Sequence, residues 1–78
     1  MDIALKDYHF AAIIQSDEDG YYAHCPDLKG CHAQGDSLDE VIANINDATR
    51  LIVEDIIECG EEVPQPKRVL LTVVQITI

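Results

Sequence analysis

The amino-acid sequence predicts an α+β fold, a two-layer βββαβ sandwich with one long helix on one face of a four-stranded mixed sheet. Three observations support it. Three short β-rich runs lie before residue 36, an amphipathic stretch fills residues 37–60, and a last apolar run fills residues 68–78. A single helix joins the third and fourth strands, so these strands should be parallel and the crossover right-handed.

The helix has a defined start, face and end. Ser37 and Glu40 have the spacing of a capping box, and Gly60 follows the last periodic residue. Asp47 and Glu54 fall on the polar side, and Leu51 lies off the apolar stripe, so we expect all three to be exposed. The predicted core stripe consists of Leu38, Val41, Ile42, Ile45, Ala48, Thr49, Ile52 and Ile56.

The strands are delimited by turn residues. The expected elements, in order, are a strand at 8–15, a turn at 16–20, a strand at 21–25, a turn at 26–30 and a strand at 31–34. The first two strands form a hairpin. Pro64 and Pro66 exclude a helix after residue 60, so this segment should be an extended connector to the last strand.

Composition limits the class of protein. The 78 residues form one domain, 1–78, and the net charge of −10 disfavours direct nucleic-acid binding and favours a basic partner. No apolar run is long enough to span a membrane, and nothing indicates secretion, so we expect a cytoplasmic protein. Cys25, Cys31 and Cys59 are therefore expected to be reduced thiols. No cofactor is expected.

Several short motifs follow one another in a defined order along the chain. They are Asp-Glu-Asp-Gly-Tyr-Tyr at 17–22, Pro-Asp-Leu-Lys-Gly-Cys at 26–31, Gln-Gly-Asp-Ser at 34–37, then the long helix and Pro-Gln-Pro at 64–66. This combination resembles the HicB family of antitoxins over most of the chain. The positions that match the family motifs are Asp19, Gly20, Tyr21, Pro26, Asp27, Leu28, Gly30, Cys31, Gly35 and Asp36.

The resemblance implies a fold and a function. It implies a degenerate RNase H-like fold and a non-enzymatic protein that binds a small HicA toxin. Such toxins are mRNA-cleaving ribonucleases with a double-stranded-RNA-binding-domain fold, and the antitoxin would mask the RNA-binding and active surface. Full-length relatives carry a DNA-binding module after the last strand, whereas this sequence stops at Ile78. The resemblance therefore implies the solitary form, without operator binding of its own.

The residues leave other readings open. The motif turns either shape the backbone, as Gly, Pro and Asp commonly do, or form a ligand-binding loop in a stand-alone homo-oligomeric protein that binds a small ligand. His24, Cys25, Cys31 and His32 are zinc-ligand types, but neighbours on a strand point to opposite faces, so no metal site is predicted.

Catalysis is not predicted either. RNase H-type nucleases hold two metal ions with clustered carboxylates, and Asp17, Glu18 and Asp19 are acidic. These three residues lie in a turn, where charges usually face water. We therefore assign no catalytic residue and treat a metal-dependent nuclease as the weakest alternative.

Carboxylates also gather near the end of the helix. They form either a solvated face or a docking surface for a basic toxin, where they would replace the phosphates of its RNA. The residues of this acidic set are Glu54, Asp55, Glu58, Glu61 and Glu62.

The final run predicts self-association. It is apolar on both faces and would form an uncovered edge strand, which favours pairing with another chain. We expect a homodimer or a tetramer. The expected contact residues are Val73, Val74, Ile76 and Ile78.

Overall fold

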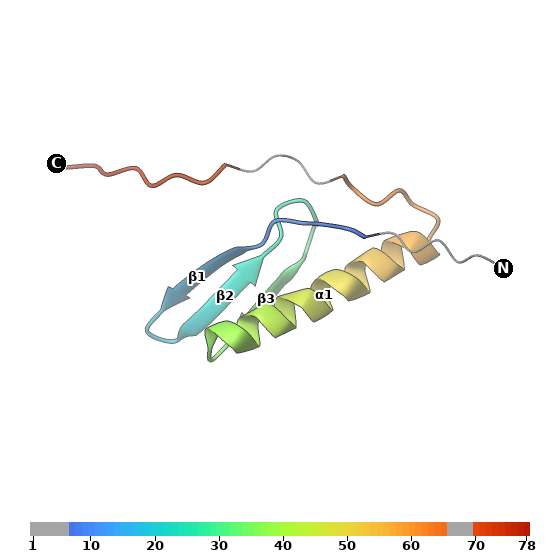
Figure 1. Cartoon of the computed structure of the whole chain (residues 1–78), viewed down its shortest axis with the longest axis horizontal. Coiled ribbons are helices and arrows are strands. Elements are labelled where there is room, and N and C mark those ends of the chain that lie inside the picture. Colours follow the sequence, from blue (N-terminus) through green and yellow to red (C-terminus); the bar gives the residue numbers. More distant parts are fainter. Residues whose placement is uncertain (1–6, 66–69) are drawn as a thin grey trace.

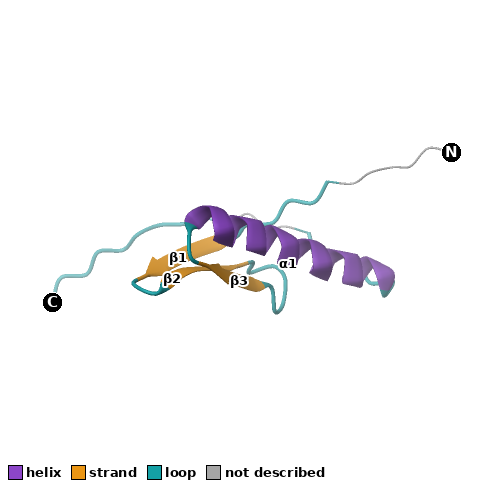
Figure 2. Cartoon of the chain, turned by 90° about the horizontal axis from the view of Figure 1, so that it is seen from below, coloured by secondary structure: helices purple, strands orange, loops and turns teal. Residues whose placement is uncertain are grey.

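A computed structural model describes residues 7–65 and 70–78 of the chain (Figure 1). Three strands precede one helix: β1 (Ile13–Asp17), β2 (Gly20–His24), β3 (His32–Gly35) and α1 (Leu38–Glu58). The strands form an antiparallel sheet in the order β1-β2-β3, and Figure 2 shows α1 lying across one face of it. The predicted α+β class, with one long helix packed on a sheet, is confirmed.

The β1–β2 hairpin closes more tightly than the sequence predicts. Its turn consists of Glu18 and Asp19 alone, and Asp17 pairs directly with Gly20. The Asp17 carboxylate accepts a hydrogen bond of 2.8 Å from the Asp19 N–H, which fixes the turn. Gly20 has φ of 144°, a conformation that a side chain would strain. The expected five-residue turn at 16–20 is therefore wrong at its first two positions, which belong to β1, and at Gly20, which belongs to β2.

Strand β1 also begins later than predicted, at Ile13 instead of residue 8. The reason is the length of its neighbour, because β2 ends at His24 and the chain then turns away at Pro26. Residues 8–12 consequently have no ladder partner among the described residues. Part of this segment lies against the helix, where Tyr8 and Phe10 line a cleft together with α1 residues.

Helix α1 begins as the capping box predicts. Ser37 has extended backbone, and its hydroxyl oxygen accepts a hydrogen bond of 3.1 Å from the Glu40 N–H. At the other end, Gly60 has φ of 75°, and the Glu61 N–H donates to the carbonyl of Ile56 at 3.0 Å. The left-handed glycine thus closes the helix and turns the chain away. Within the described residues, no helix has the length and apolarity that crossing a membrane requires.

The helix covers β2 and β3 but not β1. Its flank above β3 is held by Asn44, whose side-chain amide donates a 2.8 Å hydrogen bond to the Gln34 carbonyl. Close packing at this end depends on Gly35, because a Cβ there would lie 2.7 Å from the backbone nitrogen of Val41. The result is a half-covered sheet, in which Ile14 of β1 remains 37% exposed on the helix side.

The core lies between the middle of α1, the end of the hairpin and the loop at 26–30. Its buried residues are Ala23, Cys25, Leu28, Cys31, Val41, Ile45, Val53 and Val63. No polar or charged residue is buried among the described residues.

The predicted helix stripe is correct in its middle and wrong at its edges. Ile45 is buried as expected, and Ile52 is partly buried against the core. Leu38 and Ile42 were expected in the core but are 47% and 40% exposed, and the helix makes no contact with β1 that could cover them. Val53, outside the predicted stripe, is buried.

The polar side of the helix agrees with the prediction. Asp47 and Glu54 are exposed. Leu51 is 66% exposed, so its predicted position off the core stripe is confirmed. A large apolar side chain therefore remains in solvent on the surface of α1.

The predicted fourth strand is not formed within the single chain. Residues 70–78 carry no strand, and residues 68 and 69 lie outside the described residues. A strand requires a ladder partner, and in this chain residues 70–78 extend away from the sheet without pairing with it (Figures 1 and 2). The four-stranded mixed sheet is thus replaced by three antiparallel strands.

Candidate partner-binding surface

The loop between β2 and β3 is a compact, hydrogen-bonded unit. The Cys25 N–H donates to the Cys31 carbonyl at 3.0 Å, and the Leu28 N–H donates back to the Cys25 carbonyl at 3.1 Å. Gly30, with φ of 77°, closes the loop in a conformation suited to glycine. This geometry directs Leu28 inward, where it is only 3% exposed. The loop thus extends the core beyond the ends of the strands.

Two buried thiols join this loop to the helix. The sulfur atoms of Cys25 and Cys31 lie 3.4 and 3.3 Å from the hydroxyl oxygen of Thr49. Thr49 donates its own proton to the Ile45 carbonyl at 2.7 Å, so its oxygen accepts from the two thiols. Burial raises the pKa of Cys25 above its usual value. The Cys25 thiol is therefore protonated and unreactive, as core cysteines usually are.

The zinc-ligand residues are divided between two faces. His24 and His32 are directly opposite each other and exposed on the sheet face away from α1, whereas Cys25 and Cys31 are buried on the helix side. In the part of the chain that the structure describes, no group of three or more His, Cys, Asp or Glu side chains is arranged to hold a metal ion.

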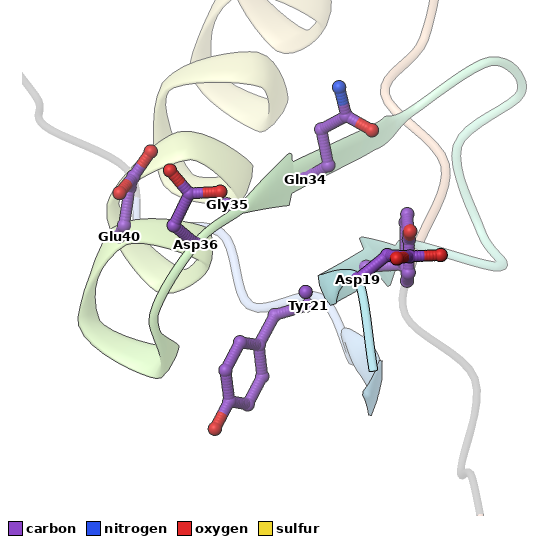
Figure 3. A pocket seen from close by; sticks show the side chains of 8 residues that line it. Asp19, Tyr21, Gln34, Gly35, Asp36 and Glu40 are labelled. Carbon is purple, nitrogen blue, oxygen red and sulfur yellow. The ribbon is translucent and has the colours of Figure 1, made fainter. Parts of the chain in front are cut away.

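The hairpin turn and the start of the helix border a cleft of about 300 Å³. In Figure 3, Asp36 and Glu40 lie beside each other at the start of α1, and Asp19 lies at the end of the sheet. Gly20 fits closely here, because a Cβ would lie 2.9 Å from the Gly35 carbonyl oxygen. The motif residues of this region therefore bring backbone segments close together, and the acidic groups around the cleft are exposed.

A larger and more apolar cleft of about 730 Å³ lies beside the second half of α1. The helix contributes the exposed Leu51 to the lining, and the loop at 26–30 contributes the buried Leu28. Asp55 and Glu61 add carboxylates to the apolar lining. We call this cleft the helix groove; its lining residues are Asp27, Leu28, Lys29, Leu51, Ile52, Asp55, Ile56, Glu61 and Pro64.

The structure distributes the predicted acidic set around the end of the helix. All five members are exposed. Asp55 and Glu61 line the helix groove, and Glu61 also borders, with Glu62, a second cleft of about 640 Å³ next to Tyr8. Glu54 and Glu58 lie on the exposed surface of α1. Part of the set is thus combined with apolar surface, which sequence reasoning did not predict.

The groove was missed because its parts are far apart in the sequence. Leu28, Leu51 and Pro64 come from the loop, the helix and the connector. The one available signal was Leu51, a large apolar residue on the polar side of an amphipathic helix. Single exposed apolar residues are common on protein surfaces, so this signal alone does not locate a groove.

These features define a class of protein. An exposed apolar groove is typical of surfaces that bind another protein or a ligand. The chain as a whole is a small α+β module with one helix on a three-stranded sheet.

Comparison with known proteins gives the family. Residues 9–75 match the family described as HicB_like antitoxin of bacterial toxin-antitoxin system. A UPF0150 protein of Synechocystis, ssr1765, is 43% identical over 65 residues, which cover 82% of this chain and 80% of that protein. A UPF0150 protein of Thermotoga maritima is 33% identical over 69 residues, covering 86% and 88% of the two chains.

A solved structure gives the same result. A chain of a HicA3 and HicB3 toxin-antitoxin complex superposes with a TM-score of 0.58 at 25% identity, covering 70% of this chain and 65% of that one. The protein belongs to the HicB-like antitoxin family, and it is an antitoxin of a toxin-antitoxin system and not an enzyme. The match spans slightly less than two thirds of the solved chain.

Proposed function

We propose that this antitoxin neutralises a small, basic, mRNA-cleaving toxin of the HicA type by covering its RNA-binding and active surface, and that the helix groove is the docking site. The observation that carries the proposal is the exposed Leu51 beside Asp55, in a groove that also contains Glu61. The structural similarity to a chain from a HicA3 and HicB3 complex supports a toxin of this type as the partner.

The chemistry of the groove fits such a partner. An RNA-binding surface is basic because it contacts phosphates, and carboxylates can take the place of those phosphates. The net charge of −10 attracts a basic protein at long range, which speeds association at low salt. Apolar side chains such as Leu51 and Ile56 supply the desolvated centre on which affinity depends.

The motif turns have a supporting role in this proposal. The loop at 26–30 places Leu28 under the groove, and Gly20 and Gly35 hold the hairpin close to the start of α1. They position the binding surface and bind no small ligand of their own. Pro26, Asp27, Gly30 and Cys31 belong to the same loop, and Asp19, Tyr21 and Asp36 to the hairpin end.

Two further parts of the proposal concern the cellular compartment and the oligomeric state. A toxin that cleaves mRNA acts where mRNA is translated, so the antitoxin should act in the cytoplasm. The chain should also self-associate, as a homodimer or a tetramer, through its last apolar residues, which include Val73, Val74, Ile76 and Ile78.

Co-expression with the toxin tests the docking site. The proposal expects a gene for such a toxin next to that of this chain. Its product, a small basic HicA-type protein, is the probe and is produced with the antitoxin or with its Leu51→Glu variant. Wild-type antitoxin should restore growth and co-purify with the toxin, and Leu51→Glu should lose both. Ile57→Glu is the matched control, because Ile57 is 50% exposed on the same helix but lies outside the helix groove.

The outcomes separate the possibilities. Equal loss in both variants would place the contact elsewhere on α1. Full activity of Leu51→Glu would exclude the helix groove. Failure of the wild-type chain to bind or rescue would contradict the toxin-neutralising function itself.

A further inference from the structure

The last described segment, which we call the C-terminal arm (residues 70–78), is apolar and unprotected. Its six large apolar side chains are between 70% and 116% exposed. Thr72, Gln75 and Thr77 lie between them, and the arm carries no charged side chain. An extended apolar segment of this kind is stable only when another surface covers it.

The sheet has a free edge that matches the arm. Strand β1 pairs with β2 on one side only, and its other side has no strand neighbour among the described residues. The open edge consists of the five residues of β1, so it can pair with five of the nine residues of the arm.

Beside that edge lies exposed apolar surface, which we call the open flank (Ile14, Leu38 and Ile42). These residues are 37%, 47% and 40% exposed. Asn44 holds the opposite flank of the helix over β3, so Leu38 and Ile42 lie toward β1. A strand added next to β1 would cover the open flank with the side chains on its helix-facing side.

We propose that the C-terminal arm of one copy pairs with the open β1 edge of a second copy, and that the second copy returns its own arm in a two-fold exchange. Each sheet then gains a fourth strand. The arm side chains Val74 and Ile76 would lie over the open flank of the partner. This exchange gives the fourth strand that the sequence predicts and that the single chain lacks.

Geometry and charge favour the arm of a second copy over other possible partners of the open β1 edge. The arm lies apart from its own sheet (Figures 1 and 2) and forms no ladder with its own β1 edge. The arm lacks charges, and the open edge is interrupted by one acidic residue, Asp17, so the net charge of −10 opposes this contact less than any contact along the acidic helix.

The buried area is sufficient for a stable dimer. Each apolar side chain that becomes buried removes roughly 60–120 Å² from water, so the four on the helix-facing side of one arm, Leu70, Val74, Ile76 and Ile78, contribute about 350 Å². Two reciprocal arms, together with the surfaces that they cover, reach the roughly 1,200–2,000 Å² of stable interfaces. A second copy therefore accounts for the arm, the open edge and the open flank together.

Sedimentation of the full chain without toxin tests the exchange. At micromolar concentration and physiological salt we expect a species of twice the 8.7 kDa chain mass. Val74→Glu should weaken the dimer by at least about tenfold, whereas Gln75→Glu, which adds the same charge at the adjacent polar position, should change it by less than about threefold. Ile42→Glu should dissociate the dimer as Val74→Glu does, and Ile57→Glu should not.

Mixing the two dissociating variants identifies the mode of contact. The Ile42→Glu chain keeps an intact arm and the Val74→Glu chain keeps an intact open flank, so the mixture should form a heterodimer although each variant alone is monomeric. Pairing of arm with arm would give no heterodimer, and a face-to-face contact of sheets would survive Val74→Glu. Either result, or a monomeric wild-type chain, would overturn the proposal. Because no toxin is present, the outcome is independent of the neutralising function.

Discussion

Replacing Gly35 with alanine tests how closely the helix packs on the sheet. Gly35 is the last residue of β3, and its φ lies outside the positive region. A Cβ there would lie 2.7 Å from the nitrogen of Val41 and 3.1 Å from its Cα. Both are backbone atoms of α1, so relief requires a shift of the whole first turn of the helix.

The cost follows from this geometry. Overpacking of a tight contact typically costs about 1–3 kcal/mol, and the lower entropy of the unfolded alanine chain offsets about 0.4–1 kcal/mol. The expected net loss is about 1–2 kcal/mol, or roughly 5–15 °C in melting temperature for a domain of this size. Thermal and urea unfolding followed by circular dichroism measure it.

A second glycine supplies the control. Gly60 has φ of 75°, and a Cβ there meets nothing within 4 Å, so its substitution costs only backbone strain. From alanine to leucine the destabilisation should grow at Gly35 and stay nearly constant at Gly60. A loss below about 0.5 kcal/mol for Gly35→Ala, or equal growth at both sites, would refute the close approach of α1 and β3.

Three further predictions concern the core. Ile45→Ala should cost about 2–5 kcal/mol in denaturant unfolding, and Ile52→Ala less, because Ile52 is only partly buried; the reverse order would mean that the helix face is misassigned. In the folded protein a thiol reagent should label the exposed Cys59 first and the buried Cys25 and Cys31 only on unfolding. The raised pKa of Cys25 should leave its contribution to stability complete below pH 9.0, the ordinary value, and reduce it as pH rises through the higher folded pKa; Cys25→Ala should remove that decline.

Local signals in the sequence were sufficient for the helix and the hairpin. Ser37 and Glu40 determine the start of α1 by a side-chain hydrogen bond that the sequence spacing predicts. The alternation of residues in β2 likewise gives its buried face, with Ala23 turned to the helix. These elements depend on residues only a few positions apart, so pattern and structure agree.

Contacts between distant segments were not predictable in the same way. The length of β1 is set by the end of β2 at His24. Nothing in the sequence of residues 8–12 indicates that limit. The exposure of Ile42 depends on the helix lying over β3, and the apolar last run was placed in a sheet that the single chain does not complete. Predicting the helix groove would have required the relative positions of three segments, and Leu51 was the one residue that indicated it.

The neutralising function is tested most directly by titrating the antitoxin against RNA cleavage by the purified HicA-type toxin that the proposal expects as its partner. We expect cleavage to stop near one antitoxin chain per toxin, and Leu51→Glu to need at least about tenfold more protein, while Ile57→Glu behaves as the wild type. Undiminished cleavage at an excess of wild-type antitoxin would contradict the central claim that this chain covers the surface with which the toxin binds RNA.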